Sequence, residues 1–517
     1  MKLIFQTIFF SLFFFSCGEK FLDEQPITDR LSKEYFANAD DIRTILAGAY
    51  QPMRWDFNGD YGGFCMPYLY TDVRSDDVIL ENKNNQPHSH GLEDFVSLTT
   101  SNIDVQVIWL KFFTGVANAN EIIQGLVQVN DDIISKSEKE PLLAEARFLR
   151  AYYYFELVKN FGDVPLFGDV PADIADPNQI KRSPKAEVYV QIESDLEYAA
   201  NMLPLMQDEL YKATQGAAMG LLSKVFLYQE KWQQAADMAQ AVVNLNLYGL
   251  EEDYGDNWKI TNEYGIESLF EISYFNDVSG QSPYYTSAKT SLALQYFAPP
   301  FDTTNAYGWS FNLITPELLQ AFNDAGDQER RDATIMQEGH EFDSPILEAL
   351  GVNPIPEGWF DKWINHPTSN GLRYGNDFKY SLKYFLTPEE VNEHCFKYRS
   401  SSLNQKVLRY AEILLILAES VVNGAAGNGQ EALDQVRQRA GLASVPLTLN
   451  AVKLERRLEL ATEWNRFHDL VRWEDAADEI QGFTNGRDEL LPIPLDDIVL
   501  VGKLPNGKFI LEQNPGY

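Results

Sequence analysis

Apolar residues recur at helical spacing through the first half of the chain and again near its end. In KEPLLAEARFLRAYYYFELVKNF, every third or fourth residue forms an apolar stripe, made of Leu142, Ala146, Leu149, Tyr153 and Leu157. Residues at this spacing share one face of a helix, so the stretch predicts an amphipathic helix over 138–161. Gly162 predicts its C-terminal cap, and Pro165 follows just beyond.

Further helices follow, and two of them form a pair. SPKAEVYVQIESDLEYAANMLP predicts a helix with Ser183 as N-cap and Pro184 at the first helical position. QGAAMGLLSKVFLYQEKWQQAADMAQAVVNLN splits near Lys231 into two helices whose packing residues are Leu222, Phe226, Ala235 and Ala239. Bulky residues opposite alanines resemble a tetratricopeptide unit, in which two antiparallel helices approach closely. LRYAEILLILAESVVN followed by GQEALDQVRQRAGL is a weaker second instance.

The middle of the chain has a different pattern. Between about 248 and 405, helical periodicity fades, Tyr, Trp, Phe, Asn, Gly and Pro become frequent, and short helices such as TPELLQAF stand alone. A long irregular region inside a globular chain is usually functional. We therefore predict a mostly α fold: a tetratricopeptide-like scaffold of helical pairs over 41–247 and 406–517, with an irregular, aromatic-rich, ligand-binding lobe inserted at 248–405. The last part is expected to end in an extended tail.

The N-terminus reads MKLIFQTIFFSLFFFSCGEKFLDEQP. Its apolar run, 3–15, is shorter than the roughly 20 residues of a membrane-spanning helix and follows a single positive charge, which is typical of a secretory signal. The run stops at residue 15, and Cys17, two residues later, stands at the position that a lipobox requires. We predict a lipoprotein signal peptide over 1–16 and a lipidated tether over 17–40; an ordinary signal peptide with an incidental cysteine is the alternative.

Composition narrows the function only slightly. The 517 residues carry 42 Lys+Arg against 76 Asp+Glu, a formal net charge of -34. So negative a chain is soluble and disfavours nucleic acid and anionic membrane surfaces as partners. The two other cysteines, Cys65 and Cys395, either form a disulfide or remain separate thiols, because sequence separation does not give their distance.

Six ordered segments resemble the SusD-like, or RagB/SusD, family of outer-membrane lipoproteins. They are CGEKFLDEQP, RFLRAYYYFELVKNFGDVPLF, LRYAEILLILAE, VRQRAGL, ERRLELATEWNRFHDLVRW and the ending LLPIPLDDI…QNPGY. Together they extend over 17–517. One departure is Trp464-Asn465, where the family usually has Glu-Gly. The charged residues of these motifs are expected to form pairs on or between helices.

This resemblance implies a function. Proteins of the family sit over a SusC-like TonB-dependent transporter, bind oligosaccharides or, less often, peptides, and deliver them to the channel. They are not enzymes and need no cofactor. The resemblance also implies a lipid anchor at Cys17 that holds the protein on the outer membrane, exposed at the cell surface.

Two stretches correspond in position to glycan-binding loops of the family. Sugar binding needs aromatic faces for stacking and polar side chains for the hydroxyls. The first stretch, VILENKNNQPHSHGLEDF, follows YTDVRSDD, which is similar to the family's SDE element, and has no tryptophan. Its candidates are Asn82, Asn84, Asn85 and His88; a solvated polar loop is the alternative. The second runs from SGQSPYY to TTNAYGWSF, and its candidates are Tyr284, Tyr285, Tyr307 and Trp309.

Catalytic and metal sites are not predicted. DFNGDYG spaces oxygens like the start of an EF-hand, but its glycine falls one place late and Pro67 occupies the place of the bidentate glutamate. His468-Asp469 lacks a nucleophile segment, and no GxSxG, HExxH, P-loop or dinucleotide fingerprint occurs. Three hypotheses remain: a glycan-binding lipoprotein, a peptide-capturing member of the same family, and a secreted glycosidase, which rests only on abundant carboxylates and aromatic residues.

Overall fold

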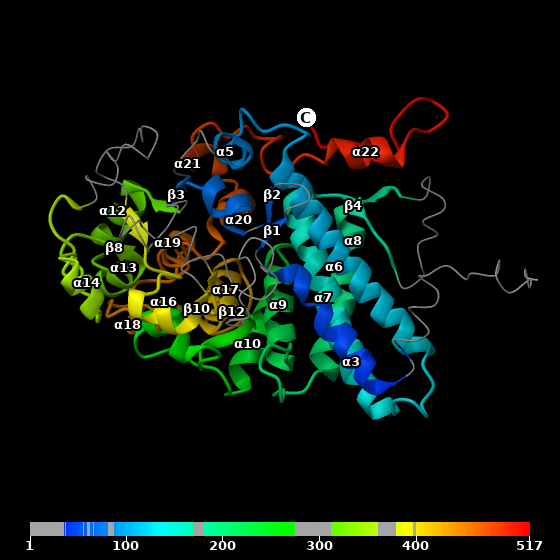
Figure 1. The fold of residues 1–517 in the computed structure, drawn as a ribbon, viewed down its shortest axis with the longest axis horizontal. Helices are drawn as coiled ribbons and strands as arrows, with labels where there is room; N and C mark the ends of the chain where they lie inside the picture. The colour runs from blue at the N-terminus through cyan, green and yellow to red at the C-terminus, as the bar shows by residue number, and fades with distance from the viewer. Residues whose placement is uncertain are drawn as a thin grey trace, which may run out of the picture.

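Helices dominate the regular structure, as predicted (Figure 1). The structure, a computed structural model, describes residues 36, 38–54, 56–58, 63–65, 67–80, 87–168, 180–274, 312–359, 379–396 and 400–517. Neither the DFNGDYG turn at 59–62 nor the side chains of Cys65 and Cys395 lie within the described parts. The cysteine pairing therefore stays open.

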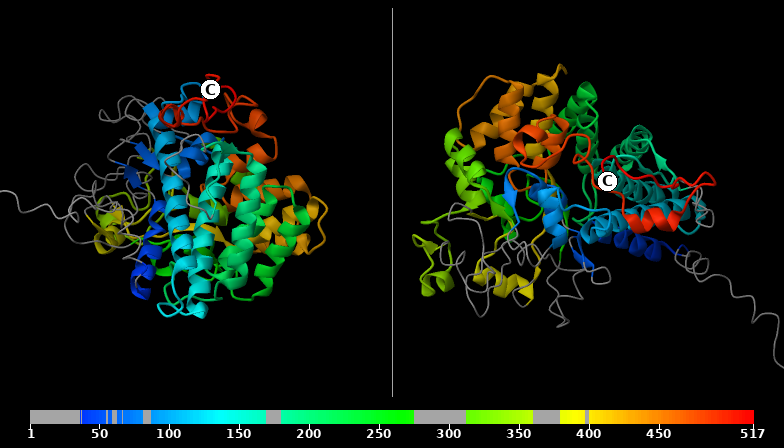
Figure 2. Two further views of the ribbon diagram at one scale, coloured as in Figure 1. Left: turned by 90° about the vertical axis from the view of Figure 1, so that its right-hand side faces the viewer. Right: turned by 90° about the horizontal axis from the view of Figure 1, so that it is seen from above.

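A row of helices forms the scaffold, and each packs against the next in the order α6, α7, α8, α9, α10, α17, α18. Their bounds are α6 (Ile103–Gln128), α7 (Lys136–Phe161), α8 (Lys185–Met202), α9 (Gln215–Leu227), α10 (Trp232–Asn244), α17 (Tyr410–Val422) and α18 (Gly429–Arg439). Although 165 residues of chain separate α10 from α17, these two helices pack directly on each other. The row is therefore continuous across the insertion, and Figure 2 (left) shows its cyan, green and orange members side by side.

Helix α7 is the predicted helix, but it is not amphipathic. It begins two residues earlier than predicted, behind a capping box in which Ser135 and Glu138 satisfy each other's backbone groups. It ends at Phe161, where Gly162 takes a φ of 71°. All five stripe residues are buried, and so are Arg150 and Tyr154 on other faces. Neighbours on several sides, namely α3 (Ala39–Gly48), α6, α8, α9 and strand β4 (Val164–Pro165), account for this burial, which a single stripe could not reveal.

The helical pair at 215–244 matches the prediction closely. The chain turns between α9 and α10 at Tyr228–Lys231, and all four predicted packing residues, two on each helix, are buried. One cap differs from the prediction. Helix α8 begins at Lys185 with Pro184 as the capping residue, while Ser183 pairs with Val164 in a short ladder. Asp163 accepts the hydrogen bond from the Lys185 N–H instead, at 2.7 Å.

A four-stranded antiparallel sheet joins distant parts of the chain. Its order is β3-β7-β9-β8, from β3 (Val78–Ile79), β7 (Leu313–Ile314), β9 (Lys379–Ser381) and β8 (Ile335–Met336). A second ladder pairs β6 (Ser268–Ile272) with β12 (Gln405–Arg409). The other named helices and strands are α4 (Pro67–Tyr70), α5 (Pro87–Asp94), α12 (Pro316–Ala325), α13 (Gln328–Thr334), α14 (Pro345–Ala349), α16 (Pro388–His394), α19 (Leu449–Glu459), α20 (Arg466–Arg472), α21 (Ala476–Glu479), α22 (Leu495–Val501), β1 (Asp56–Asn58), β2 (Gly63–Cys65), β5 (Arg182–Ser183), β10 (Cys395–Phe396) and β11 (Ser400–Ser401).

The middle of the chain has a small core of its own. Trp359, Leu313 and Tyr380 belong to it, apart from the main core of the helical row. In a third cluster, Ile314 and Phe322 from the middle of the chain pack with Leu458 from α19. Trp258 is buried against Tyr384 in the main core.

Candidate functional site: the sheet at the roots of two predicted binding segments

Most of the predicted ligand-binding residues belong to two segments outside the described ranges. Asn82, Asn84 and Asn85 fall in 81–86, and the four aromatic candidates fall in 275–311: Tyr284, Tyr285, Tyr307 and Trp309. Cys17 likewise precedes the described residues. His88 is described and lies in α5. The geometry of the site therefore has to be built from the places where these segments join the fold.

The two segments join one sheet at neighbouring positions. Strands β3 and β7 pair antiparallel, with Ile79 opposite Leu313 and Val78 opposite Ile314. The chain leaves β3 through Leu80 into the first segment, and it enters β7 through Asn312 from the second. Paired strands lie about 4.8 Å apart. The start of the first predicted segment and the end of the second are therefore adjacent at the sheet, where Ile79 and Leu313 pair although they are 234 residues apart in sequence.

Helix α5 fixes the other end of the first segment. The carbonyl of His88 accepts a hydrogen bond from the Asn102 side chain at 2.8 Å, and the Ser89 hydroxyl donates to Asp104 at 2.5 Å. Glu93 accepts from the backbone N–H of Leu80 at 3.3 Å. Leu80, just before the segment, is thus held by α5, and the first residues of α5 after the segment are held by the start of α6. The half-buried His88 side chain stays a predicted ligand contact.

Two arginines from the C-terminal motif hold the residues just before β3. Arg466 forms a two-pronged pair with Asp76 at 2.8 and 2.9 Å, and Arg457 donates to Asp77 at 2.6 and 2.8 Å. Arg457 also reaches Asp76 at 2.9 Å. Burial alone raises the pKa of Asp76, but the hydrogen bond and charge of Arg466 outweigh it and hold that pKa below its ordinary value. The RSDD sequence therefore serves as an anchor that α19 and α20 clamp.

A buried arginine holds the same stretch from the other side. Arg74 lies over the Phe467 ring, 4.0 Å from its centroid, and 5.6 Å from that of Phe95. One of its nitrogens donates to the carbonyl of Asp488 at 2.6 Å. Complete burial lowers the pKa of Arg74 to about 10. The aromatic faces supply part of the stabilisation that water would otherwise give the charge.

The charged family motifs form a buried network beneath the sheet. Arg409 bonds Glu463 at 2.7 Å, Glu459 at 3.0 Å and also Glu267. Lys383, two residues after β9, donates to Glu463 at 2.7 Å. The sequence predicted such pairs on or between helices, and the structure places these between elements, inside the protein. This network ties β6, β9 and β12 to the end of α19.

The departure from the family pattern has a backbone consequence. When the family's ERRxELAxEGxRxxDLxRW pattern is aligned on Arg466 and Asp469, its glutamate falls on Glu463 and its glycine on Trp464. The departure is therefore Trp464 alone, and the expectation of a Glu-Gly pair at Trp464-Asn465 was wrong. Trp464 has a φ of 68°, in the left-handed region that glycine adopts without strain. Its ring stacks on Tyr384 at a centroid distance of 5.7 Å and an interplanar angle of 29°. This chain therefore places an aromatic side chain in the core where the family pattern has none.

His468 and Asp469 lie in the interior of the described protein. Among the described residues, no three His, Cys, Asp or Glu side chains are grouped as metal ligands. His468 is buried, and burial lowers its pKa well below the ordinary value. Its neighbour Asp469 pairs with Arg456 at 2.8 Å. Within the same ranges, no helix combines the length and apolar character that crossing a bilayer requires.

The comparisons with known proteins agree with these motifs. Residues 20–227 match a family described as "Starch-binding associating with outer membrane", and residues 266–492 match the "SusD family". SusD-like protein P2 of Formosa agariphila is 26% identical over 529 residues and covers 96% of both chains. A solved structure titled "Laminarin binding SusD-like protein" has a TM-score of 0.75 and 28% identity, covering 93% of this chain and 100% of its own. Surface glycan-binding protein A from Bacteroides fluxus gives a TM-score of 0.74 at 25% identity, covering 93% of this chain and 100% of that one.

Two family models therefore cover most of the chain between them, one over 20–227 and the other over 266–492. The solved relatives share the helical row and cover nearly all of this chain. Two of the motifs that suggested the family, LRYAEILLILAE and ERRLELATEWNRFHDLVRW, supply Arg409, Arg457 and Arg466, which hold the strands described above. The chain belongs to the SusD/RagB family.

Proposed function

We propose that this protein is a non-catalytic lipoprotein of the outer membrane that captures an oligosaccharide or polysaccharide at the cell surface. It would be held by lipid on Cys17 and would pass the glycan to a SusC-like TonB-dependent transporter. The observation that carries the proposal is the β3–β7 pairing, which roots the polar and the aromatic segment at one edge of one sheet. Likeness to glycan-binding relatives over more than nine-tenths of the chain supports it.

In this proposal the binding surface belongs to the lobe at 248–405, together with 82–88. Aromatic faces from Tyr284, Tyr285, Tyr307 and Trp309 would stack on sugar rings, and Asn82, Asn84, Asn85 and His88 would bond the hydroxyls. The clamp of Arg457 and Arg466 on Asp76 and Asp77 supports this division of roles, since it makes the base of the first segment rigid. A rigid base lowers the entropy cost of binding.

Laminarin is the first glycan to test, because a structure 28% identical to this chain carries it in its title. The experiment measures binding of the lipid-free chain from Gly18 onward to laminarin, other polysaccharides and peptides, by affinity gel and calorimetry. We expect saturable binding to one glycan class without release of shorter sugars. Trp309→Ala and Tyr284→Ala should weaken it about tenfold or more while the protein stays folded.

Each other outcome has a definite meaning. Glycan binding that survives both substitutions would keep the function and reject these two residues as the site. Binding of peptides without glycans would favour the peptide-capturing alternative. Release of shorter sugars, abolished by a single Glu→Gln change, would reject the non-catalytic assignment.

A further inference from the structure

A cavity lies away from the β3–β7 edge, between the end of α3, the turn at 204–213 and strand β6. Its volume is about 180 Å³, and Tyr50, Tyr211 and Phe270 form much of its wall. One water molecule takes up ~30 Å³ in the liquid, so the cavity has room for a molecule of several heavy atoms. It is smaller than the ~300–1,000 Å³ of sites for whole drug-sized ligands. The size suits a single ring with its substituents.

Two tyrosines give the cavity aromatic walls at right angles. Their rings lie 5.5 Å apart between centroids, with an interplanar angle of 89°. The Tyr50 hydroxyl donates to Glu145 at 2.7 Å and accepts from the Ala213 N–H at 3.1 Å, so the orientation of that ring is fixed. Tyr211 lies on the surface turn and is half-buried. A ring-shaped ligand would therefore contact the face of one tyrosine ring and the edge of the other.

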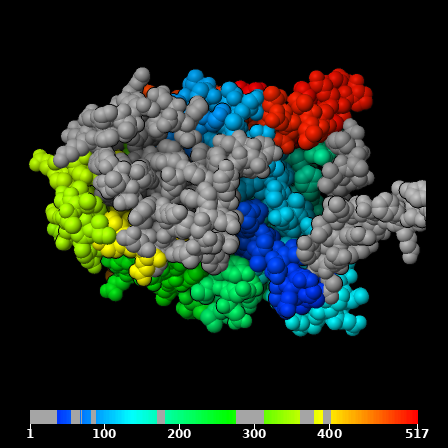
Figure 3. All heavy atoms as spheres, viewed as in Figure 1, coloured from blue at the N-terminus to red at the C-terminus, as the bar shows by residue number. Residues whose placement is uncertain are grey.

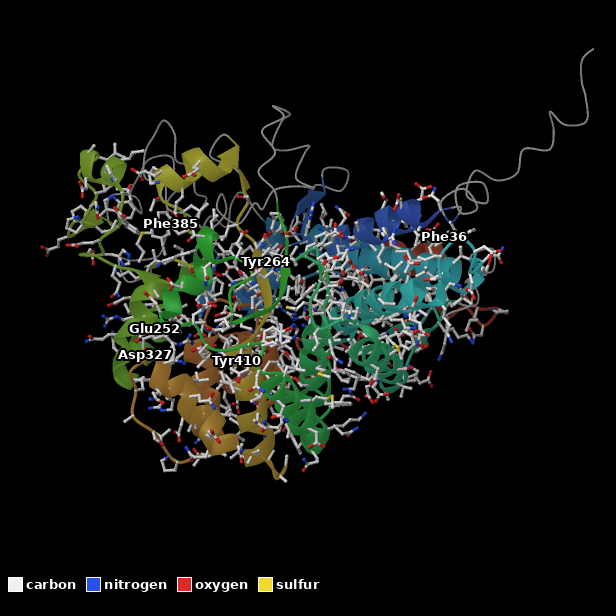
Figure 4. The ribbon with its side chains drawn as sticks, turned by 90° about the horizontal axis from the view of Figure 1, so that it is seen from below. Phe36, Glu252, Tyr264, Asp327, Phe385 and Tyr410 are labelled. Atoms are coloured by element: carbon white, nitrogen blue, oxygen red, sulfur yellow. The ribbon has the colours of Figure 1, made fainter. Side chains whose placement is uncertain are left out.

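The polar groups of the cavity suit a ligand with hydroxyl groups. Arg54 lies over the Tyr274 ring, 5.9 Å from its centroid, and the Ser273 hydroxyl bonds that of Tyr264 (labelled in Figure 4). Glu271, the acidic group of the lining, is paired with Lys406 at 2.5 Å. Its charge is therefore compensated, and the cavity does not select a cation. Aromatic faces with a few polar groups are what a sugar ring needs.

The position of the cavity connects it to the proposed binding lobe. Its floor is β6, and two residues beyond that strand the chain enters 275–311, the segment with the predicted stacking residues. Ala47 on the opposite wall is exposed, and α3 lies open on the face shown in Figure 3. A glycan on the lobe would therefore find this cavity at the root of the same segment.

We propose that the cavity is a subsite that holds one pyranose residue of the bound glycan. The proposal rests on the proposed function and adds a specific position to it. Affinity should then rise at one step in a series of oligosaccharides of increasing length, when the chain becomes long enough to reach the cavity. The residues that produce this step are Tyr50, Tyr211 and Arg54, none of which stands in a pattern that singles it out in the sequence.

The test fills the cavity without substituting any residue of the lobe. Ala47→Phe places a ring in the opening, and Thr44→Phe puts the same ring on an exposed position of the same helix. Tyr211→Ala removes a wall, with Leu210→Ala, which lies outside the lining and is 65% exposed, as its control. Calorimetry with an oligosaccharide series should show that Ala47→Phe and Tyr211→Ala lose the last affinity step, about tenfold. Affinity for shorter chains should not change, and both controls should behave as wild type.

Three results would overturn the subsite. The affinity step could survive in both cavity variants, Thr44→Phe could weaken binding as much as Ala47→Phe, or affinity could fall equally for every chain length. In each case wild-type glycan binding, and with it the proposed function, would stand. If the wild-type protein binds no glycan of the panel, the proposed function fails before any variant is compared, and the subsite fails with it.

Discussion

At the scale of single residues, the protein tolerates unusual local states where several neighbours support them. Trp464 holds a left-handed backbone, and Tyr384, which stacks on it, has a φ of 66°. For a residue with a Cβ, such a conformation costs about 1–2 kcal/mol. Both rings lie in the core beside Trp258, so burial and aromatic packing offset that cost. The position shows why a glycine in a family pattern is not always required.

Glu145 makes a prediction about pH. This carboxyl is buried on α7 and accepts a hydrogen bond from Tyr50, and burial raises its pKa to about 7 from the ordinary 4.5. Between these two values the folded protein binds more protons at this site than the unfolded chain does. The contribution of Glu145 to folding stability therefore falls as pH rises from about 4.5 to 7.

Glu145→Gln keeps an acceptor for Tyr50 and removes the titration. We expect the variant to be more stable than wild type by about 1–3 kcal/mol at pH 8 and nearly equal to it at pH 4.5. Urea unfolding of the lipid-free protein at both pH values measures this difference. An equal difference at the two pH values would show that Glu145 has an ordinary pKa in the folded protein.

At the scale of elements, short strands depend on what holds their ends. Strand β3 has two residues and contributes little pairing by itself. Its position is set by Asp76 and Asp77, which Arg466 and Arg457 clamp from α20 and α19. The C-terminal motif thus positions the strand from which the chain enters the predicted binding segment, although neither arginine is predicted to touch the glycan.

Arg466→Ala tests this clamp. It leaves a largely buried Asp76 with half of its partners, and breaking a buried pair costs about 3–5 kcal/mol. Glycan affinity should fall too, because the base of the 81–86 segment becomes loose. The stability and glycan affinity of Arg466→Lys should lie between those of wild type and Arg466→Ala, because lysine keeps the charge but not the two-pronged geometry.

The matched control is Arg331→Ala, whose partner Asp332 has a side chain that is 56% exposed, and which should cost less than about 1 kcal/mol. Urea unfolding gives the stability of each variant and calorimetry gives its affinity for glycan. If Arg466→Ala unfolds and binds like Arg331→Ala, the clamp has no role in positioning β3.

At the scale of the whole molecule, sequence periodicity and motifs anticipated the helical row well. The split between α9 and α10 and the end of α7 at Gly162 followed from local patterns. What could not be predicted are contacts between distant residues. Arg457 and Asp77 are 380 positions apart, and β3 and β7 are two residues long, too short for any periodic signal. The Tyr50–Tyr211 cavity was missed for the same reason, since its walls come from unrelated segments.

The same long-range contacts determine how the lobe and the helical row hold together. Arg409 stands where β12 meets α17 and contacts three glutamates, Glu267, Glu459 and Glu463. Burial by itself raises the pKa of Glu459, but Arg439, Arg409 and Arg330 outweigh it and hold that pKa far below the ordinary 4.5. Glu459 therefore stabilises the folded protein above about pH 4.5, and this contribution is lost as pH falls.

Arg409→Met tests this balance between burial and positive charge by removing one of the cations. Methionine fills much of the space but leaves the three glutamates with fewer cations, so we expect a loss of about 3–5 kcal/mol at pH 8. With less positive charge nearby, the pKa of Glu459 rises, and its protonation at lower pH relieves repulsion among the carboxylates. The stability gap between wild type and variant should therefore narrow clearly from pH 8 to pH 5 in urea unfolding, whereas for Arg331→Met it should stay small throughout. A gap of constant size would mean that Glu459 keeps its charge without Arg409, and that Arg439 and Arg330 suffice to stabilise it.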